Sequence, residues 1–320
     1  MSNFKNKNSF NKVVLDIKNL EIQGATNIAI AAVKSLKFIL SDFSKIESKS
    51  NSKSNSKPNK LISELKNAKK KLFKSRPTEP MLRNALNYVL SDVDKYAMDE
   101  TDKLILRLNH RIDQALEIIS KGKLEISKIG SKKIKKNMVV FTHCHSKSVV
   151  DILLLAKSKG KKFEVHNTET RPRYQGRKTA KELASHGIKV THYVDSAARL
   201  ALKKADLFLI GADAITVEGK VINKIGSELF AEVAKRYQIP IYVCTHSWKF
   251  DPQTIFGFEE PIELRSESEV WPDKPKNVKI QNFAFEQVDP DLISGVITEL
   301  GIYKPESLVE ELKSRNKFMF

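Results

Sequence analysis

Apolar residues recur at helical spacing through the first 130 residues of the chain. Residues 12–49 predict two helices that are broken at Gly24. Residues 48–60 read SKSNSKSNSKPNK, and because this stretch has no apolar side chain to bury, we expect a flexible loop. The helical pattern resumes over 61–129, with a bend where prolines interrupt it at 76–80. The pattern predicts an all-helical unit.

From Met138 onward the pattern changes to short, continuous apolar runs. These runs, typical of buried parallel strands, lie at 138–143, 162–167, 189–194, 207–211 and 239–244. Helical spacing separates them at 146–158, 175–186, 196–203 and 226–236. A strand-like run at 278–288 and a helix at 306–313 complete the expected elements. We therefore expect an α/β protein, in which an N-terminal all-helical domain (1–130) precedes a doubly wound, mainly parallel Rossmann-like sheet domain (131–320).

Composition is that of an ordinary globular protein, with 41% hydrophobic residues among 320. The formal charge of +18 raises the question of a nucleic-acid partner. The lysines are spread over almost every segment, however, and no aromatic residues alternate with them as a base-stacking surface requires. We therefore expect no nucleic-acid site. A positive surface would also attract a phosphorylated small molecule.

The chain lacks several other kinds of signal. No apolar run approaches the roughly 20 residues that cross a bilayer, and residues 1–11 do not resemble a secretory signal, so we expect a cytoplasmic protein. Cys144 and Cys244 lie a hundred residues apart without CxxC spacing, which predicts two free thiols. Neither GxGxxG nor GxxxxGK[ST] occurs, which argues against a dinucleotide or nucleoside triphosphate.

Polar residues follow three of the predicted strands, at 142–146, 168–172 and 211–213. Parallel strands end at one edge of a sheet, which is where such folds bind ligands. A helix that begins near Ser146 would direct its N-terminal amides at Cys144 and lower the pKa of the thiol, so the pattern predicts a thiolate. Alternatively, Cys144 is a small buried hydrophobic residue, and Asp213 is a turn former beside Gly211.

The remaining polar residues near these strand ends leave further alternatives open. His143 and His145 form a possible metal pair, but no third ligand lies nearby in the sequence. Arg171, held in an extended conformation by Pro172, suits a phosphate, or alternatively an ion pair with Glu169 or one at a domain interface. Residues 223–227 end a short strand and open a helix, a typical place to bind phosphate or hydroxyl groups.

Five motifs, in order along nearly the whole chain, resemble one superfamily. They are THCHS (142–146), TETRPRYQGRKTAKELASHGI (168–188), VDSAA (194–198), GADAITVEGKVINKIGS (211–227) and VITELGIYKPESL (296–308). The superfamily joins methylthioribose-1-phosphate isomerases, archaeal ribose-1,5-bisphosphate isomerases and the regulatory subunits of the initiation-factor 2B guanine-exchange complex. Within it, the first four motifs look like ribose-1,5-bisphosphate isomerase, as does SRPTEPMLRNAL (75–86).

The resemblance implies an aldose–ketose isomerase of AMP metabolism that uses neither a metal nor an organic cofactor. It implies that Cys144 and Asp213 are the catalytic acid–base pair. The residues that it implies for substrate binding are Gly24, Ala25, Arg76, Arg171, Gln175, Asn223 and Lys224. The implied partners are a sugar bisphosphate and further copies of the chain, either as a homo-hexamer built as a trimer of dimers or as a dimer.

One position departs from the pattern of the enzymes. Gln23 stands where they generally carry an arginine that helps to bind phosphate, and Gln23–Gly24 looks more like the regulatory subunits. Two alternatives therefore remain. One is a non-catalytic subunit that senses a sugar phosphate or nucleotide, and the other is an isomerase for another phosphorylated pentose, such as methylthioribose 1-phosphate.

Overall fold

The computed structural model describes residues 2–47, 57–259 and 262–320. The chain divides into two compact units, Met1–Lys121 with Asn316–Phe320, and Gly122–Arg315. The division falls inside the long helix α5 (Thr101–Ser131). The boundary expected at 130 and 131 lies in the last turn of the same helix, and as a domain boundary it stays a prediction.

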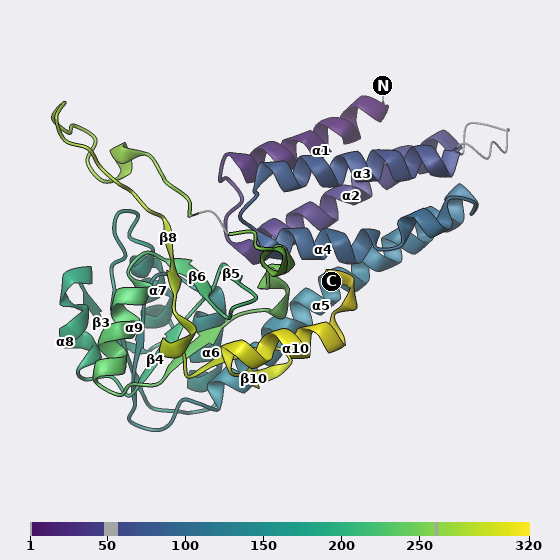
Figure 1. Cartoon of the computed structure of the whole chain (residues 1–320). Helices are drawn as coiled ribbons and strands as arrows, with labels where there is room; N and C mark the ends of the chain where they lie inside the picture. The colour runs from purple at the N-terminus through teal and green to yellow at the C-terminus, as the bar shows by residue number, and fades with distance from the viewer. Residues whose placement is uncertain (1, 48–56, 260–261) are drawn as a thin grey trace. The chain divides into compact units, whose positions relative to one another are not determined.

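The first unit is helical. It contains α1 (Ser2–Lys18), α2 (Ala25–Glu47), α3 (Lys57–Ser75), α4 (Pro80–Leu90), η1 (Val93–Tyr96), the first part of α5 and, from the end of the chain, η7 (Lys317–Met319). Figure 1 shows α1, α2 and α3 side by side. Along α2, every fourth side chain from Ile28 to Leu40 is buried, which gives this helix one continuous apolar face.

Two boundaries of the helical unit can be compared with the sequence pattern. The break at Gly24 is present, where φ is +84°. The predicted end of the loop at residue 60 is wrong, because α3 already begins at Lys57. Pro58 lies in the first turn, where a missing N–H costs the helix no hydrogen bond. Residues 48–56 lie outside the described residues.

The second unit contains a seven-stranded sheet in the order β10-β9-β7-β4-β1-β2-β3. Its strands are β1 (Val139–Thr142), β2 (Glu164–Thr168), β3 (Lys189–Tyr193), β4 (Leu207–Ile210), β7 (Ile241–Cys244), β9 (Gly295–Thr298) and β10 (Gly301–Tyr303). Neighbouring strands are parallel except β9 and β10. The expected α/β fold with a mainly parallel sheet is confirmed.

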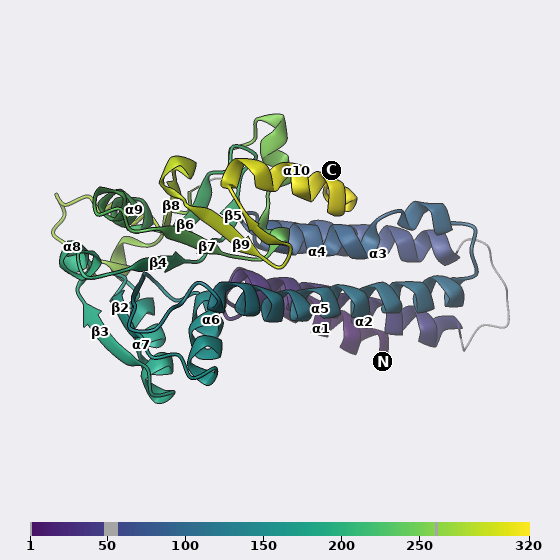
Figure 2. The same ribbon diagram turned by 90° about the horizontal axis from the view of Figure 1, so that it is seen from below.

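Helices connect these strands on both faces of the sheet. They are α6 (Lys147–Ser158), α7 (Gln175–Ser185), α8 (Ala198–Leu202) and α9 (Ser227–Arg236), followed by α10 (Pro305–Arg315). In Figure 2, α6 and α7 lie together, as do α8 and α9. A smaller antiparallel sheet orders β5 (Ala214–Ile215), β6 (Val221–Lys224) and β8 (Phe285–Val288).

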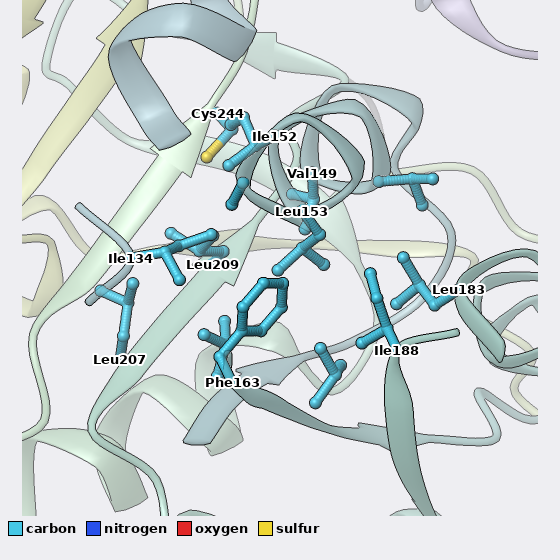
Figure 3. Packing of buried hydrophobic residues seen from close by; sticks show 14 of the residues in the cluster. Ile134, Val149, Ile152, Leu153, Phe163, Leu183, Ile188, Leu207, Leu209 and Cys244 are labelled. Carbon is cyan, nitrogen blue, oxygen red and sulfur yellow. The ribbon is translucent and has the colours of Figure 1, made fainter. Parts of the chain in front are cut away.

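The core of the sheet unit forms where α6 covers the strands. Figure 3 shows Ile152 and Leu153 of α6 among the buried side chains of this cluster, together with Phe163 and Leu209. Cys244 belongs to the same cluster and is 1% exposed. Cys244 is therefore a core residue. Among the helices of the described residues, none is both long enough and apolar enough to cross a membrane.

Candidate active site

The two residues with candidate acid–base chemistry lie where the sheet changes its winding direction. In the sheet, β1 lies between β2 and β4, so the chain winds outward in opposite directions from this point. Ligands of open α/β sheets bind in the crevice at such a switch. Cys144 follows β1 and Asp213 follows β4. The strand ends pack closely, since a β-carbon at Gly211 would lie 2.6 Å from Ser146 Oγ.

The backbone of Cys144 is held in an unusual conformation. Its φ is +66°, in the left-handed region that costs a residue with a side chain on the order of 1 kcal/mol. Its N–H donates to Thr170 Oγ1 at 3.0 Å, and its carbonyl accepts from Thr179 Oγ1 at 2.9 Å. Thr179 in turn accepts from His145 Nδ1 at 3.0 Å. Hydrogen bonds on both sides thus fix the direction of the Cys144 side chain.

His143 precedes Cys144, packs beneath this turn through two hydrogen bonds, and is 2% exposed. Its Nε2 lies 2.8 Å from the carbonyl of Ile225, which can only accept, so Nε2 carries the proton. Its Nδ1 then accepts from Thr168 Oγ1 at 2.6 Å. Burial lowers the pKa of His143 to about 4, which keeps the ring neutral. Both ring nitrogens are engaged within the protein, so His143 has no nitrogen left for the metal pair considered with His145.

The thiol of Cys144 does not have the lowered pKa expected from the sequence. Desolvation by the surrounding protein raises its pKa to about 11, and this effect outweighs the lowering by the Lys224 ammonium. The helix α6 does begin behind Cys144, with Ser146 as its N-cap. A helix terminus contributes less than about 1 kcal/mol in most settings, which is too little to offset the loss of water around a thiolate. The expectation of a thiolate is wrong.

Three charged side chains act on the thiol from neighbouring elements. Lys224 at the end of β6 lowers the pKa of Cys144, whereas Asp213 and Asp195 raise it. Lys224 is only 8% exposed, and its ammonium lies 4.2 Å from the centre of the Phe285 ring. The structure therefore brings three predicted residues together, namely Cys144, Asp213 and Lys224.

Asn223 precedes Lys224 on β6 and is also buried. Its side chain donates to Ser227 Oγ at 2.8 Å, and Ser227 donates to the carbonyl of Lys224 at 2.6 Å. Gly226 between them has φ of +99°, and an added β-carbon would lie 3.2 Å from His143 Nε2. This turn therefore links the β6 residues to the support beneath Cys144.

Arg171 lies in the turn between β2 and α7. Arg171 donates to the Tyr174 hydroxyl at 2.5 Å and to the carbonyl of Val270 at 3.2 Å. The alternative ion pair with Glu169 is wrong, because Glu169 pairs with Arg177 at 3.1 Å.

Gln175 begins α7. Its buried Oε1 has no hydrogen-bond partner within the described part of the chain. An amide oxygen in this state suits a hydroxyl group of a ligand.

Asp195 is a functional candidate that the sequence reasoning missed. Its carboxylate accepts from the backbone N–H groups of Thr170 at 2.8 Å and Arg171 at 2.7 Å. It therefore fixes the turn that holds the Cys144 N–H and the Arg171 guanidinium. The signal was available, because Asp195 follows β3 just as the recognised residues follow β1, β2 and β4.

Lys249 is a second missed candidate. It lies in η3 (Ser247–Lys249) after β7, and its ammonium donates to the carbonyl of Ala212, next to Asp213. A cation is thereby held at the carboxyl end of β4. No motif marked this lysine, because a lysine among 56 basic residues carries little information by itself.

Gly24, Ala25 and Arg76 belong to the helical unit. The carbonyl of Gly24 accepts from the N–H of Ile28 at 3.0 Å, and Ala25 is the first residue of α2. Arg76 lies between α3 and α4, where its Nε is 3.6 Å from Glu79. That these three residues share a site with Cys144 stays a prediction.

Comparison with known proteins shows which enzymes the chain is similar to. The chain is similar to the ribose 1,5-bisphosphate isomerase of Pyrococcus furiosus, with 39% identity over 95% of this chain and 93% of the relative. The relative of the same name from Methanocaldococcus jannaschii is 37% identical over 91% of this chain and 90% of its own length. A methylthioribose-1-phosphate isomerase of Fervidobacterium nodosum is 32% identical over 92% and 86%.

Solved structures share the fold. A translation initiation factor eIF-2B of Pyrococcus horikoshii OT3 superposes with a TM-score of 0.75 at 24% identity, over 93% of this chain and 98% of that one. At this identity the likeness shows the fold alone. The model of the initiation factor 2 subunit family matches residues 21–305. With this match and the curated relatives in agreement, the chain belongs to the initiation factor 2 subunit family.

Proposed function

We propose that this chain is an isomerase that converts ribose 1,5-bisphosphate into ribulose 1,5-bisphosphate. The observation that carries the proposal is that Cys144, Asp213 and Lys224 lie at the ends of β1, β4 and β6, close enough for Asp213 and Lys224 each to act electrostatically on the Cys144 thiol. Relatives named as this isomerase support it, at 32–39% identity over 91–95% of the chain.

The reaction has to open a ring whose anomeric oxygen carries a phosphate. Asp213 gives a proton to the ring oxygen O4 as the C1–O4 bond breaks, and the electron pair of that bond stays on O4. The phosphate-bearing oxygen stabilises the positive charge at C1. The Cys144 thiolate then removes the C2 proton, and the electron pair of the C2–H bond becomes a C1=C2 double bond.

The second half of the reaction restores both side chains. The enol takes the proton from Cys144 at C1, and its C2 hydroxyl returns a proton to Asp213 as the C2 carbonyl forms. Asp213 is then a carboxylic acid again and Cys144 a thiolate. The atoms of substrate and product balance without an added oxidant or reductant.

The raised pKa of Cys144 sets a requirement on this scheme. The two side chains need one proton between them, and the catalytic form carries it on Asp213. Because the thiol has a pKa of about 11, the scheme requires Cys144 to lose its proton when the substrate is bound.

Several other residues suit a phosphorylated sugar. Lys224, Arg171 and Lys249 provide cations for phosphate, with Arg76 as a further candidate from the helical unit. Asn223 and Gln175 provide amide groups for hydroxyls, and Gly24–Ala25 provide the start of α2. We propose that these residues bind the substrate.

The test is turnover by purified Cys144→Ser and Asp213→Asn variants. Each is expected to lose roughly 10²–10⁴-fold in kcat, because each removes one general acid or base. Cys244→Ser is the matched control, since Cys244 lies in the apolar core. Near wild-type turnover by either active-site variant would rule out the assignment.

A second candidate function is a sensor that binds a sugar phosphate or nucleotide without converting it. Gln23 favours it, because its side chain donates to the carbonyl of Leu20 at 2.8 Å and supplies no cation for phosphate. A coupled assay for ribulose 1,5-bisphosphate separates the two. Ligand-induced thermal stabilisation without product would support the sensor.

The third candidate is an isomerase for methylthioribose 1-phosphate, the substrate in the name of the Fervidobacterium relative. The number of cations that reach the far end of the sugar separates it from the bisphosphate enzyme, since a methylthio group needs an apolar pocket. Turnover of both sugars side by side decides between them.

We also propose a homo-oligomer, either a hexamer built as a trimer of dimers or a dimer. Light scattering of the purified chain would test this.

A further inference from the structure

A narrow pocket lies beside the crevice, within the sheet unit. It forms where residues 262–284, the segment that leads into β8 (Figure 1), meet the turn that precedes α7. Its charged lining residues are Arg171, Arg173, Lys224, Arg265 and Glu269. Four cations and one carboxylate therefore surround the same small space, an excess that attracts an anion.

Glu269 is the carboxylate of this pocket, and both of its oxygens are engaged. Arg265 donates to it from Nε at 3.0 and 3.2 Å and from Nη2 at 2.9 Å. Arg173 Nη1 lies 3.5 Å from it, and Asn282 Nδ2 lies 3.4 Å from it. A phosphate offers the same fork of oxygens to a guanidinium, with more negative charge.

The residue after Glu269 engages the third arginine. The carbonyl of Val270 accepts from Arg171 Nη2 at 3.2 Å. Two consecutive residues of the 262–284 segment thus each lie against at least one donor of the three arginines. The free volume left in the pocket is about 10 Å³, at the lower limit for a single water molecule. A phosphate can enter only where one of these protein groups leaves.

We propose that Arg171, Arg173 and Arg265 form a phosphate site, and that the Glu269 carboxylate occupies this site until a phosphate binds. The Glu269 carboxylate is an internal counter-ion, which a phosphate group of the substrate displaces from Arg173 and Arg265. The inference rests on the proposed function, because it assigns one phosphate of the sugar bisphosphate to this pocket. It makes Glu269 a determinant of substrate affinity.

Calorimetry with inorganic phosphate tests the counter-ion directly. Glu269→Gln keeps a hydrogen-bond acceptor for Arg265 but removes the competing charge, so phosphate is expected to bind about tenfold more tightly. Glu267→Gln is the matched control, since Glu267 lies in the same short helix η5 (Glu267–Glu269) and pairs with Lys274 outside the pocket. Equal phosphate affinity in the two variants would overturn the proposal.

Two further variants separate displacement from a loss of structure. Glu269→Asp keeps the charge and is expected to bind phosphate as the wild type does. Arg265→Gln, added to Glu269→Gln, is expected to cancel the gain in affinity, because it removes a donor of the phosphate site. An unchanged gain in the double variant would contradict the assignment of Arg265.

Fluorescence reports the displacement itself. The chain has two tryptophans, of which Trp248 is buried at 2% exposure and Trp271 lies two residues after Glu269 at 47%. Adding inorganic phosphate is expected to shift the emission of the wild type, and Trp271→Phe is expected to abolish the shift. No shift in the wild type at phosphate saturation would contradict displacement.

Kinetics with ribose 1,5-bisphosphate then distinguishes this inference from the isomerase proposal. A lower KM in Glu269→Gln than in Glu267→Gln is expected. If both variants turn over the substrate with equal KM, the counter-ion role of Glu269 is wrong and the isomerase proposal stands. Tighter phosphate binding in Glu269→Gln without any turnover would remove the isomerase and leave the anion site.

Discussion

Cys144 illustrates how desolvation by the surrounding protein sets the chemistry of a side chain that is itself only partly buried. Its raised pKa of about 11 leaves about one part in 10⁴ as thiolate at pH 7, and thiolate is the form that alkylates. We therefore expect alkylation by iodoacetamide to be slow at pH 7 and to accelerate about tenfold per pH unit up to about pH 11. An unperturbed thiol would level off near pH 9. Mass spectrometry of the Cys144 peptide over a pH series measures the rate.

Cys244 provides the internal comparison for that experiment. It is 1% exposed, and burial raises its pKa too, so it is expected to stay unmodified while the chain is folded. A plateau in the Cys144 rate below pH 9 would show that desolvation does not control this thiol.

His143 links acid stability to the support beneath Cys144. Its pKa is about 4 in the folded chain and 6.5 when unfolded, so the unfolded chain binds a proton first as the pH falls. The stability that this difference supplies is complete above about pH 7 and is lost as the pH falls from about 6.5 toward 4. Between pH 7.5 and pH 5 the loss is expected to be about 2 kcal/mol of unfolding free energy, measured by urea titration.

His143→Gln is the control for this titration. The amide retains one donor and one acceptor but cannot be protonated, so its own loss between the two pH values is expected to be smaller by about 2 kcal/mol. Glu228 and Glu286, whose pKa values are raised by burial, titrate in both proteins and cancel in the comparison. Equal pH dependence of the two proteins would show that His143 is not the responsible group.

At the scale of residues, the sequence predicted the positions of side chains better than it predicted their pKa values. The position of Cys144 and Asp213 at one edge of the sheet could be predicted, because a parallel sheet collects the residues that follow its strands. The pKa of Cys144 could not be predicted, because desolvation depends on how many protein atoms replace water around the sulfur. Asp195 was missed because only three of the strand ends were considered.

Among the elements, the five apolar runs all became strands. Four of them, β1, β2, β4 and β7, have a strand on either side, as buried parallel strands do, whereas β3 is an edge strand and only partly buried. β9 and β10 were not predicted, since GVIT and GIY are too short to show a period. The run at 278–288 forms a strand only over Phe285–Val288, where it pairs with β6. The preceding part instead lines the pocket that holds Glu269.

Contact between α7 and β2 makes a prediction about one glycine. A β-carbon at Gly176 would lie 1.7 Å from the carbonyl oxygen of Thr168, which is backbone and cannot rotate away. Gly176→Ala must therefore push the start of α7 away from β2, at an expected cost of about 3 kcal/mol of unfolding free energy, the upper end of the usual range for overpacking. Because Gln175 is the adjacent residue, substrate KM is expected to rise as well.

Gly160→Ala separates this clash from the general cost of replacing a glycine. Nothing lies within 4 Å of a β-carbon at Gly160, but φ is +77°, so a cost of about 1 kcal/mol is expected with unchanged KM. Urea unfolding of both variants makes the comparison. Equal destabilisation would mean that α7 tolerates the shift.

On the scale of the whole molecule, the two compact units and the strongly positive charge follow from composition and pattern, whereas the place of the division inside α5 does not. A continuous helix carries the same periodicity through both units, so no signal in its sequence marks Gly122. The net charge could be counted from the sequence, but its effect on substrate binding depends on where the substrate binds.

A charge of +18 should draw a doubly phosphorylated sugar toward the protein from a distance. This long-range attraction is screened by salt, because the Debye length falls from about 30 Å at 0.01 M to about 10 Å at 0.1 M ionic strength. We therefore expect kcat/KM for ribose 1,5-bisphosphate to fall several-fold over this range in potassium chloride. Choline chloride at equal ionic strength is expected to give the same fall, since screening does not depend on the identity of the cation. A constant kcat/KM would mean that only the cations in contact with the phosphates matter, which would transfer the whole electrostatic role to Lys224, Lys249 and the arginine pocket.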